Sequence, residues 1–171
     1  MQCDLALKQI PARAKSLGIT DPRAYLHRAR EDMTQGLALC ESPIEKHLLP
    51  WLVVADYGEK VFSFPAPVCD VKRDGLPARG DIVIVPQFTF AKYRCDFAVI
   101  RRFSKSIGIV AVECDGEEYH SAHRDVLRDG WLASFNIATV RFSGKHIYAN
   151  PQLAAAVVAE CVILLGDGAG R

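Results

Sequence analysis

Three acidic residues lie at positions where two neighbouring strands would bring them together. Asp96 interrupts the apolar stretch YRCDFAVI, and Glu113 interrupts the next one, IGIVAVEC. The midpoint between them falls inside RRFSKS, so antiparallel pairing around this turn would place Asp96 opposite Glu113, with Cβ atoms roughly 5 Å apart. Asp115 would share that face of the sheet. The opposite face would carry a core of Cys95, Phe97, Val99, Val110, Val112 and Cys114.

Three carboxylates on one patch need a counter-charge. Like charges side by side destabilise a sheet and raise the pKa of at least one carboxyl group. A hard divalent cation removes the repulsion, because Mg²⁺ takes oxygen ligands at about 2.1 Å and keeps several waters. Such a cation lowers the pKa of bound water and stabilises charge on a phosphate. The alternative is that Asp115 and Gly116 form a turn and that Arg94 or Arg128 neutralises the acids.

Positive charge gathers immediately before this acidic cluster. The segment from Lys92 to Lys105 has one acid, Asp96, and the basic residues Lys92, Arg94, Arg101, Arg102 and Lys105. The whole chain has 21 Lys and Arg against 20 Asp and Glu, so the net charge says nothing about partners. A basic stripe beside an acidic pocket would suit a polyanion held against a cation. A solvated, salt-bridged surface hairpin would give the same counts.

Glu45 belongs to a predicted helix start. The sequence ESPIEKHLLPWLVVA has Ser42 as the N-cap, Pro43 at the first helical position and Glu45 three residues after the cap. This pattern is typical of a capping box followed by an apolar run. Pro50 is expected to kink or interrupt the helix. Glu45 could therefore hold the Ser42 amide without any catalytic role.

The remaining pattern predicts an α/β fold. We expect helices over residues 1–35, 119–135 and 150–165. We expect strands over 61–68, over 82–100 in two pieces broken near Pro86 and bent near Lys92, over 107–114 and over 137–142. Helices, a strand meander and then helix–strand–helix predict a central mixed β-sheet flanked by helices. Residues 1–35 would be a helical N-terminal extension, and residues 36–171 the main domain.

Composition narrows the class of protein. The chain has 171 residues, half of them hydrophobic, which suits one domain with a full core. Its six cysteines form no C-x-x-C pair, so a zinc knuckle is not expected. The most apolar run, residues 153–165, includes Glu160 and is too short to cross a bilayer. We expect no signal peptide, no membrane partner and a cytoplasmic location.

The ordered motifs resemble a known nuclease family. Glu45 in a helix, then YRCDF, VECDGEEYH, DVLRDGWL and TVRFSGKHIY are similar to the Vsr-like endonuclease-domain family. These small bacterial proteins resemble the very short patch repair endonuclease and belong to the PD-(D/E)xK nuclease superfamily. The resemblance covers roughly residues 38–160 and is most specific over 113–147. It implies a restriction-endonuclease-like fold and metal-dependent hydrolysis of DNA phosphodiesters, by an endonuclease or nickase.

The resemblance also implies site residues. Asp96 corresponds to the superfamily's metal-binding aspartate, and Glu113 to the second acid of its E-x-K element. Glu45 matches an acid on the first core helix that orients a metal ligand or a water. His120 lies where the family has a histidine, which helps to activate water in the repair enzymes. Asp115 completes the expected ligand set for Mg²⁺ or Mn²⁺.

The sequence departs from the superfamily pattern at two positions. Asp115 replaces the usual lysine, so activation of water would fall to His120 or to a second metal. Cys95 replaces the proline that normally precedes the metal-binding aspartate. Gln87 stands where many of these nucleases carry a glutamine ahead of the aspartate strand.

The partner expected from the resemblance and the basic turn is DNA. The candidate DNA contacts are Arg101, Arg102, Lys105, Arg128 and Arg141. Arg128 could instead pair with Asp125 or reach the acids, Arg141 could face an acid, and His120 could be a surface histidine. The rival functions are an inactive DNA- or partner-binding module on a nuclease fold, and a subunit of a larger nuclease. A homodimer would supply further surface.

Overall fold

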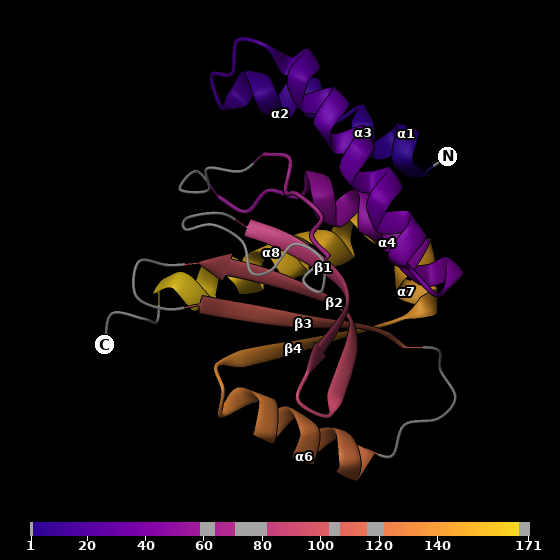
Figure 1. The fold of residues 1–171 in the computed structure, drawn as a ribbon, viewed down its shortest axis with the longest axis vertical. Coiled ribbons are helices and arrows are strands. Elements are labelled where there is room, and N and C mark those ends of the chain that lie inside the picture. The colour runs from indigo at the N-terminus through magenta and orange to yellow at the C-terminus, as the bar shows by residue number, and fades with distance from the viewer. Residues whose placement is uncertain (1, 59–63, 71–81, 103–106, 116–121, 168–171) are drawn as a thin grey trace.

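The computed structural model describes residues 2–58, 64–70, 82–102, 107–115 and 122–167 (Figure 1). The helices are α1 Gln2–Leu7, α2 Ile10–Ser16, α3 Pro22–Leu39, α4 Pro43–Val54, α6 Ala122–Ala133, α7 Gly144–Ala149 and α8 Pro151–Asp167. The strands are β1 Ile82–Phe90, β2 Tyr93–Arg102, β3 Ile107–Asp115 and β4 Ile137–Ser143. None of the helices in these ranges is both long and apolar enough to cross a membrane.

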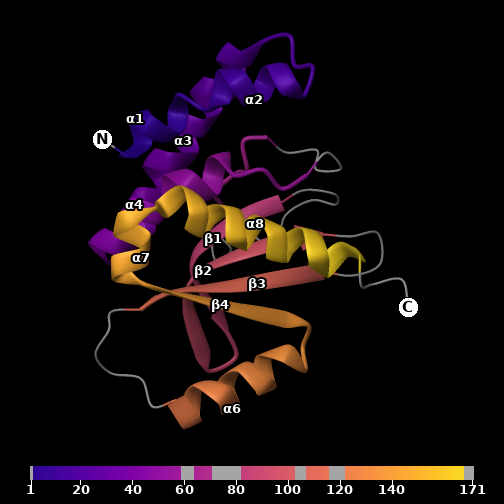
Figure 2. The same cartoon turned by 180° about the vertical axis from the view of Figure 1, so that it is seen from behind.

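The four strands form one mixed sheet in the order β1-β2-β3-β4. β1, β2 and β3 are an antiparallel meander, and β4 lies parallel to β3 after the crossover through α6. Figures 1 and 2 show α8 running across one side of this sheet and α6 lying at its other side. The predicted α/β fold with a mixed sheet flanked by helices is therefore confirmed.

Both faces of the sheet are buried. Val99, Val110 and Val112 belong to the larger core, together with apolar side chains of α4 and α8. Ala98 and Ala111 point the other way, into a smaller core that Leu132 of α6 closes. Because the strands are covered on both sides, their sequences are nearly continuous apolar runs. A charged residue within such a strand is buried and needs a partner.

The register of β2 and β3 is the predicted one, since Phe97 pairs with Val112 and Ile100 with Ile109. One expected orientation is wrong. Cys95 lies in the smaller core with Ala98, whereas Phe97 lies in the larger one, so two residues of the same parity face opposite ways. The side-chain alternation of β2 therefore breaks between Cys95 and Phe97.

Two expectations about the first strands are also wrong. β1 continues through Pro86 instead of breaking there. It is an outer strand of the sheet, where a residue without an N–H group is tolerated. Of the strand expected over 61–68, the described residues 64–68 make only one isolated bridge, between Val68 and Ile84.

The N-terminal helices pack onto the same core as the sheet. Ala6, Ile10 and Met33 belong to the hydrophobic cluster that includes the inner residues of α4 and β3. α3 runs through the predicted boundary at residue 35 without a break. At Gly36, a Cβ atom would lie only 2.6 Å from Leu49 Cδ2, so glycine permits the close approach of α3 and α4.

The predicted capping box at the start of α4 is confirmed. The Ser42 side chain accepts a hydrogen bond from the Glu45 backbone N–H at 3.2 Å, and Glu45 Oε1 accepts one from the Ser42 N–H at 3.0 Å. α4 continues through Pro50 to Val54. The cap fixes where Glu45 lies relative to the sheet.

We expect Ser42→Ala to lower the free energy of unfolding by about 1 kcal/mol, because the Glu45 N–H loses its acceptor. Urea denaturation followed by circular dichroism measures the change. Thr34→Ala is the matched control. The Thr34 hydroxyl donates to the Arg30 carbonyl on the exposed side of α3, so its loss should change the free energy of unfolding by less than about 0.5 kcal/mol. Equal losses in the two variants would contradict the capping role.

Candidate functional site

Four polar residues occupy matching positions on four adjacent strands. Glu113 of β3 lies opposite Arg141 of β4. The ladder between β2 and β3 stops one step before Asp96 and Glu113, which are the next positions in its register. The ladder between β1 and β2 skips one step, which places Gln87 opposite Asp96. We call Gln87, Asp96, Glu113 and Arg141 the polar row.

Glu113 is a charged residue inside the sheet. Among the described residues, the buried charged side chains are Glu45, 4% exposed, and Glu113, 7% exposed. Arg128 of α6 lies against Glu113, with Nη2 at 3.3 Å from Oε1. The two side chains line one pocket between β2, β3 and α6. Arg128 therefore reaches the acidic cluster, as in the alternative in which an arginine neutralises the acids.

Asp96 lies where β2 and β3 stop pairing. Its Oδ2 accepts a hydrogen bond from the Cys114 backbone N–H at 2.6 Å. The carboxylate thus takes a donor that a backbone carbonyl would take in a continuous ladder. Gln87, its neighbour on β1, has a φ of +52°, a conformation that costs a residue with a side chain free energy. The irregular backbone of both strands turns Asp96 toward β3.

Glu45 is held by three donors. Its Oε2 accepts hydrogen bonds from the Glu41 N–H at 2.9 Å and from Gln87 Nε2 at 2.7 Å. Its Oε1 accepts the capping bond from Ser42. Both oxygens are therefore engaged, and Glu45 connects the start of α4 to the polar row through Gln87.

Three buried thiols near these carboxylates have raised pKa values. The pKa of Cys114 is raised far above its ordinary value, first by burial and then by Asp96 and Glu45. Burial, Glu45 and Asp96 raise the pKa of Cys40 to about 12. Burial, Glu113 and Asp96 raise the pKa of Cys95 to about 12. Burial is the first cause at each of the three thiols, and the carboxylates add to it.

Arg141 is bound to helix α6. Its Nη1 and Nη2 donate to Asp129 Oδ2 and Oδ1 at 2.5 and 2.7 Å. These bonds and the nearby charge of Arg128 lower the pKa of Asp129, against the effect of burial. Arg141 therefore faces an acid, the alternative that the sequence left open. Asp129 was not predicted as a site residue.

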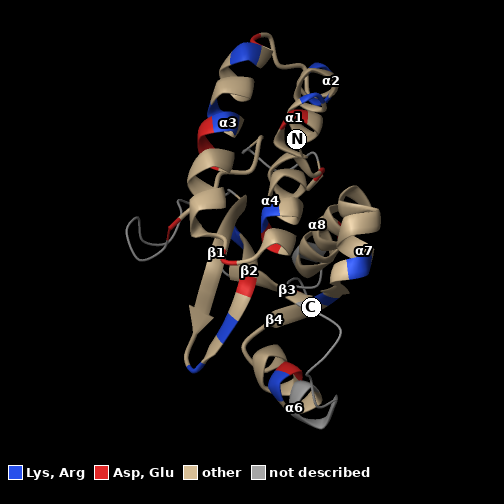
Figure 3. Ribbon diagram, turned by 90° about the vertical axis from the view of Figure 1, so that its right-hand side faces the viewer, with Lys and Arg blue, Asp and Glu red and all other residues tan. Residues whose placement is uncertain are grey.

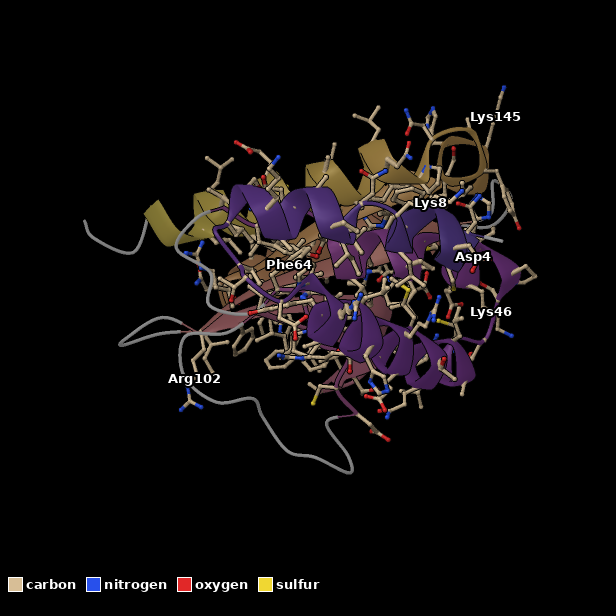
Figure 4. All side chains as sticks on the ribbon, turned by 90° about the horizontal axis from the view of Figure 1, so that it is seen from above. Asp4, Lys8, Lys46, Phe64, Arg102 and Lys145 are labelled. Atoms are coloured by element: carbon tan, nitrogen blue, oxygen red, sulfur yellow. The ribbon has the colours of Figure 1, made fainter. Side chains whose placement is uncertain are left out.

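The basic turn lies away from the polar row. Arg102 lies six positions after Asp96 on β2, which is about 20 Å along an extended strand. Figure 4 shows Arg102 at the opposite end of the molecule from Lys46 and Lys145. Lys105 lies outside the described residues, and Arg101 precedes Arg102 on the same strand end.

Two lysines near the polar row were missed by the sequence analysis. Lys46 follows Glu45 on α4, and Lys145 follows the end of β4 on α7; both are exposed. Figure 3 looks onto this end of the molecule, with acidic and basic segments on α4, β2 and α6 and a basic segment on α7. The only signal in the sequence was that Lys46 directly follows a candidate acid.

The donor chemistry suits a hard divalent cation, although the described side chains do not complete a site. Among them, no group of three His, Cys, Asp or Glu residues is arranged to hold a metal ion. The Asp115 side chain and His120 lie outside the described part of the chain, but the Asp115 backbone pairs with Ser143 at the end of β3. Mg²⁺ often takes only one or two protein carboxylates, with waters and substrate phosphates as its other ligands. Asp96 and Glu113 match that donor set.

Comparisons with protein-family models, with curated proteins and with solved structures found no match to this chain. The resemblance to Vsr-like nucleases therefore rests on the motifs in the sequence and stays a prediction. The roles that it implies for Asp96, Glu113, Asp115, His120 and Glu45 also stay predictions.

We expect Arg141→Gln to lower the free energy of unfolding by about 1 kcal/mol at pH 6, because the pair with Asp129 is bidentate but partly screened by solvent. A lowered pKa means that the ionised form of Asp129 stabilises the fold above the unfolded pKa near 4, and that this contribution is lost as pH falls through the folded value. The difference in free energy of unfolding between wild type and variant, measured by urea denaturation, should therefore become smaller from pH 6 to pH 2.

The control for this experiment is Arg94→Gln. Arg94 also makes a bidentate pair, with Glu41, but both side chains are more than half exposed. Its substitution should cost less than about 0.5 kcal/mol. A loss in Arg141→Gln that is the same at every pH would contradict the assignment to Asp129.

Proposed function

We propose that the chain is a metal-dependent DNA endonuclease or nickase with a restriction-endonuclease-like fold. The observation that carries this proposal is the burial of Glu113 in register with Asp96, at the point where β2 and β3 stop pairing. A buried carboxylate costs stability unless it has a charged partner or a metal. If this position served folding alone, an apolar residue of similar volume would give a sheet of equal or greater stability.

The proposed roles divide among the polar row and its neighbours. Asp96 and Glu113 would hold Mg²⁺ or Mn²⁺, with Asp115 assisting. The cation would lower the pKa of a bound water and stabilise negative charge on the phosphate. His120 would assist in taking a proton from the attacking water. Glu45 would act through Gln87 as a positioning residue, because both of its oxygens are already engaged.

Exposed cations around the site would bind the DNA backbone. Lys46 on α4 and Lys145 on α7 are exposed and would contact phosphates, and each contact would add salt-dependent affinity. Arg101 and Arg102 would contact DNA about 20 Å away, roughly six base pairs along the duplex. Lys105, which lies outside the described residues, is proposed as a further contact. Arg141 donates two hydrogen bonds to Asp129, so it would position α6 and would not contact DNA.

The test is nicking of supercoiled plasmid with Mg²⁺, with Mn²⁺ and with EDTA. We expect wild type to nick only with a metal, and Glu113→Gln and Asp96→Asn to lose on the order of 10²–10³-fold in rate, because each removes one charged ligand of the cation. Glu160→Gln, which neutralises an exposed carboxylate on α8, is the control and should retain full activity.

Either of two results would count against the nuclease. Cleavage that persists in Glu113→Gln would show that another centre, or a contaminant, cuts the plasmid. Absence of cleavage and of metal binding in folded wild-type protein would favour the rival, an inactive binding module on this fold.

A nuclease subunit that works as a homodimer is the second candidate, and exposed apolar residues of α6 and the residues after it favour it. Val126, Leu127 and Phe135 are among the exposed large hydrophobic side chains. Phe135 extends an aromatic cluster with Trp131 and Phe90 to the surface. Large exposed apolar patches mark protein contacts, and in this candidate these side chains would form one.

We expect light scattering to give twice the mass of one chain, and Leu127→Glu to return it to the mass of one. Leu164→Glu, which places the same charge on an exposed leucine of α8, should leave the dimer intact. A wild-type protein with the mass of one chain at high concentration would exclude the homodimer.

A further inference from the structure

Two arginines lie side by side at the polar row, and they are held in different ways. Arg141 makes two short, direct hydrogen bonds to Asp129. Arg128 approaches Glu113 only to 3.3 Å, and within the described part of the chain its Nε and Nη2 atoms are buried without a hydrogen-bond acceptor. Arg128 is therefore held by charge rather than by directed bonds, and its donors are partly unused.

Unused donors on a buried guanidinium are costly. A buried polar atom that leaves water without a partner costs the folded state free energy. The neighbouring acid does not supply the acceptor, because Arg128 Nε lies 3.9 Å from Asp129 Oδ1 and both oxygens of Asp129 already accept bonds from Arg141. An anion with free oxygens would satisfy the guanidinium better than Glu113 does in this arrangement.

A divalent cation and Arg128 compete for the same carboxylate. Glu113 can neutralise only one of them fully, and two cations held against it repel each other. α6 can stay in place while the Arg128 side chain moves, because Leu132 and Trp131 pack against the smaller core and Asp129 ties the helix to β4. The contacts that anchor α6 are therefore made by residues other than Arg128.

We propose that Arg128 is the counter-ion of Glu113 in the metal-free protein, that the catalytic cation displaces it, and that the freed guanidinium binds a substrate phosphate. This inference rests on the proposed function. It makes Arg128 a DNA-binding residue only after the metal has entered, so that metal and DNA bind with positive cooperativity.

The first test is calorimetric titration of Mn²⁺ into the full chain without DNA. Removal of the competing charge in Arg128→Gln should tighten Mn²⁺ binding by about tenfold. Arg128→Lys, which keeps a charge, should bind within about threefold of wild type. Arg94→Gln removes an exposed charge of the same kind, paired with Glu41, and should also stay close to wild type.

Arg128→Gln could fail to fold, because it removes a charge that lies 3.3 Å from the buried Glu113 carboxylate. The readout is then the shift of the melting temperature with Mn²⁺. Saturating Mn²⁺ should raise it more in Arg128→Gln than in wild type, because tighter binding stabilises the folded state more. The double variant Arg128→Gln/Glu113→Gln should fold and show no shift.

The second test is the salt dependence of duplex binding, with Ca²⁺ as the probe cation and with EDTA. In Ca²⁺, Arg128→Gln should make the slope of log affinity against log salt less steep by about 1, which corresponds to the loss of one phosphate contact. In EDTA it should leave the slope unchanged, because Glu113 then occupies Arg128.

These outcomes separate the two proposals. Mn²⁺ binding that requires Glu113 but is equal or weaker in Arg128→Gln would overturn the displacement and leave the nuclease standing. An equal change of slope with and without Ca²⁺ would do the same. Absence of Mn²⁺ binding in wild type and in every variant would overturn both.

Discussion

The arrangement of the surrounding helices depends on a negative charge that is buried inside the sheet. Glu113 sits on β3 between apolar residues of both cores, and its charge cannot be left without a partner. α6 carries Arg128 to it, and Arg141 and Asp129 tie α6 to β4. On the other side, the cap of α4 holds Glu45 and through it Gln87. The helices thus compensate charge as well as cover apolar surface.

The same constraint explains why the sheet is irregular where the acids lie. Asp96 takes the Cys114 N–H with its side chain, and the ladders on both sides of Asp96 lose a step. Gln87 adopts a left-handed backbone opposite it. Strain of this kind persists only where surrounding packing imposes it, and it concentrates at functional sites. Here the irregularity lies at Asp96, whose carboxylate takes the place of a backbone acceptor.

Local signals in the sequence were sufficient for the pairing of β2 with β3 and for the start of α4. The turn between β2 and β3 determined the register, and the capping box placed Glu45. Contacts between distant elements could not be predicted, since the Arg141–Asp129 pair depends on how the crossover brings α6 back onto β4. The orientation of Cys95 also escaped prediction, because strict alternation does not hold where pairing is interrupted.

The most direct test of the account is an anomalous difference map from crystals soaked in Mn²⁺. The account predicts one strong peak with carboxylate oxygens of Asp96 and Glu113 at about 2.2 Å, and an Arg128 guanidinium that has moved away from Glu113. A map from Mn²⁺-saturated crystals with no peak at the polar row, and with Arg128 still against Glu113, would contradict it.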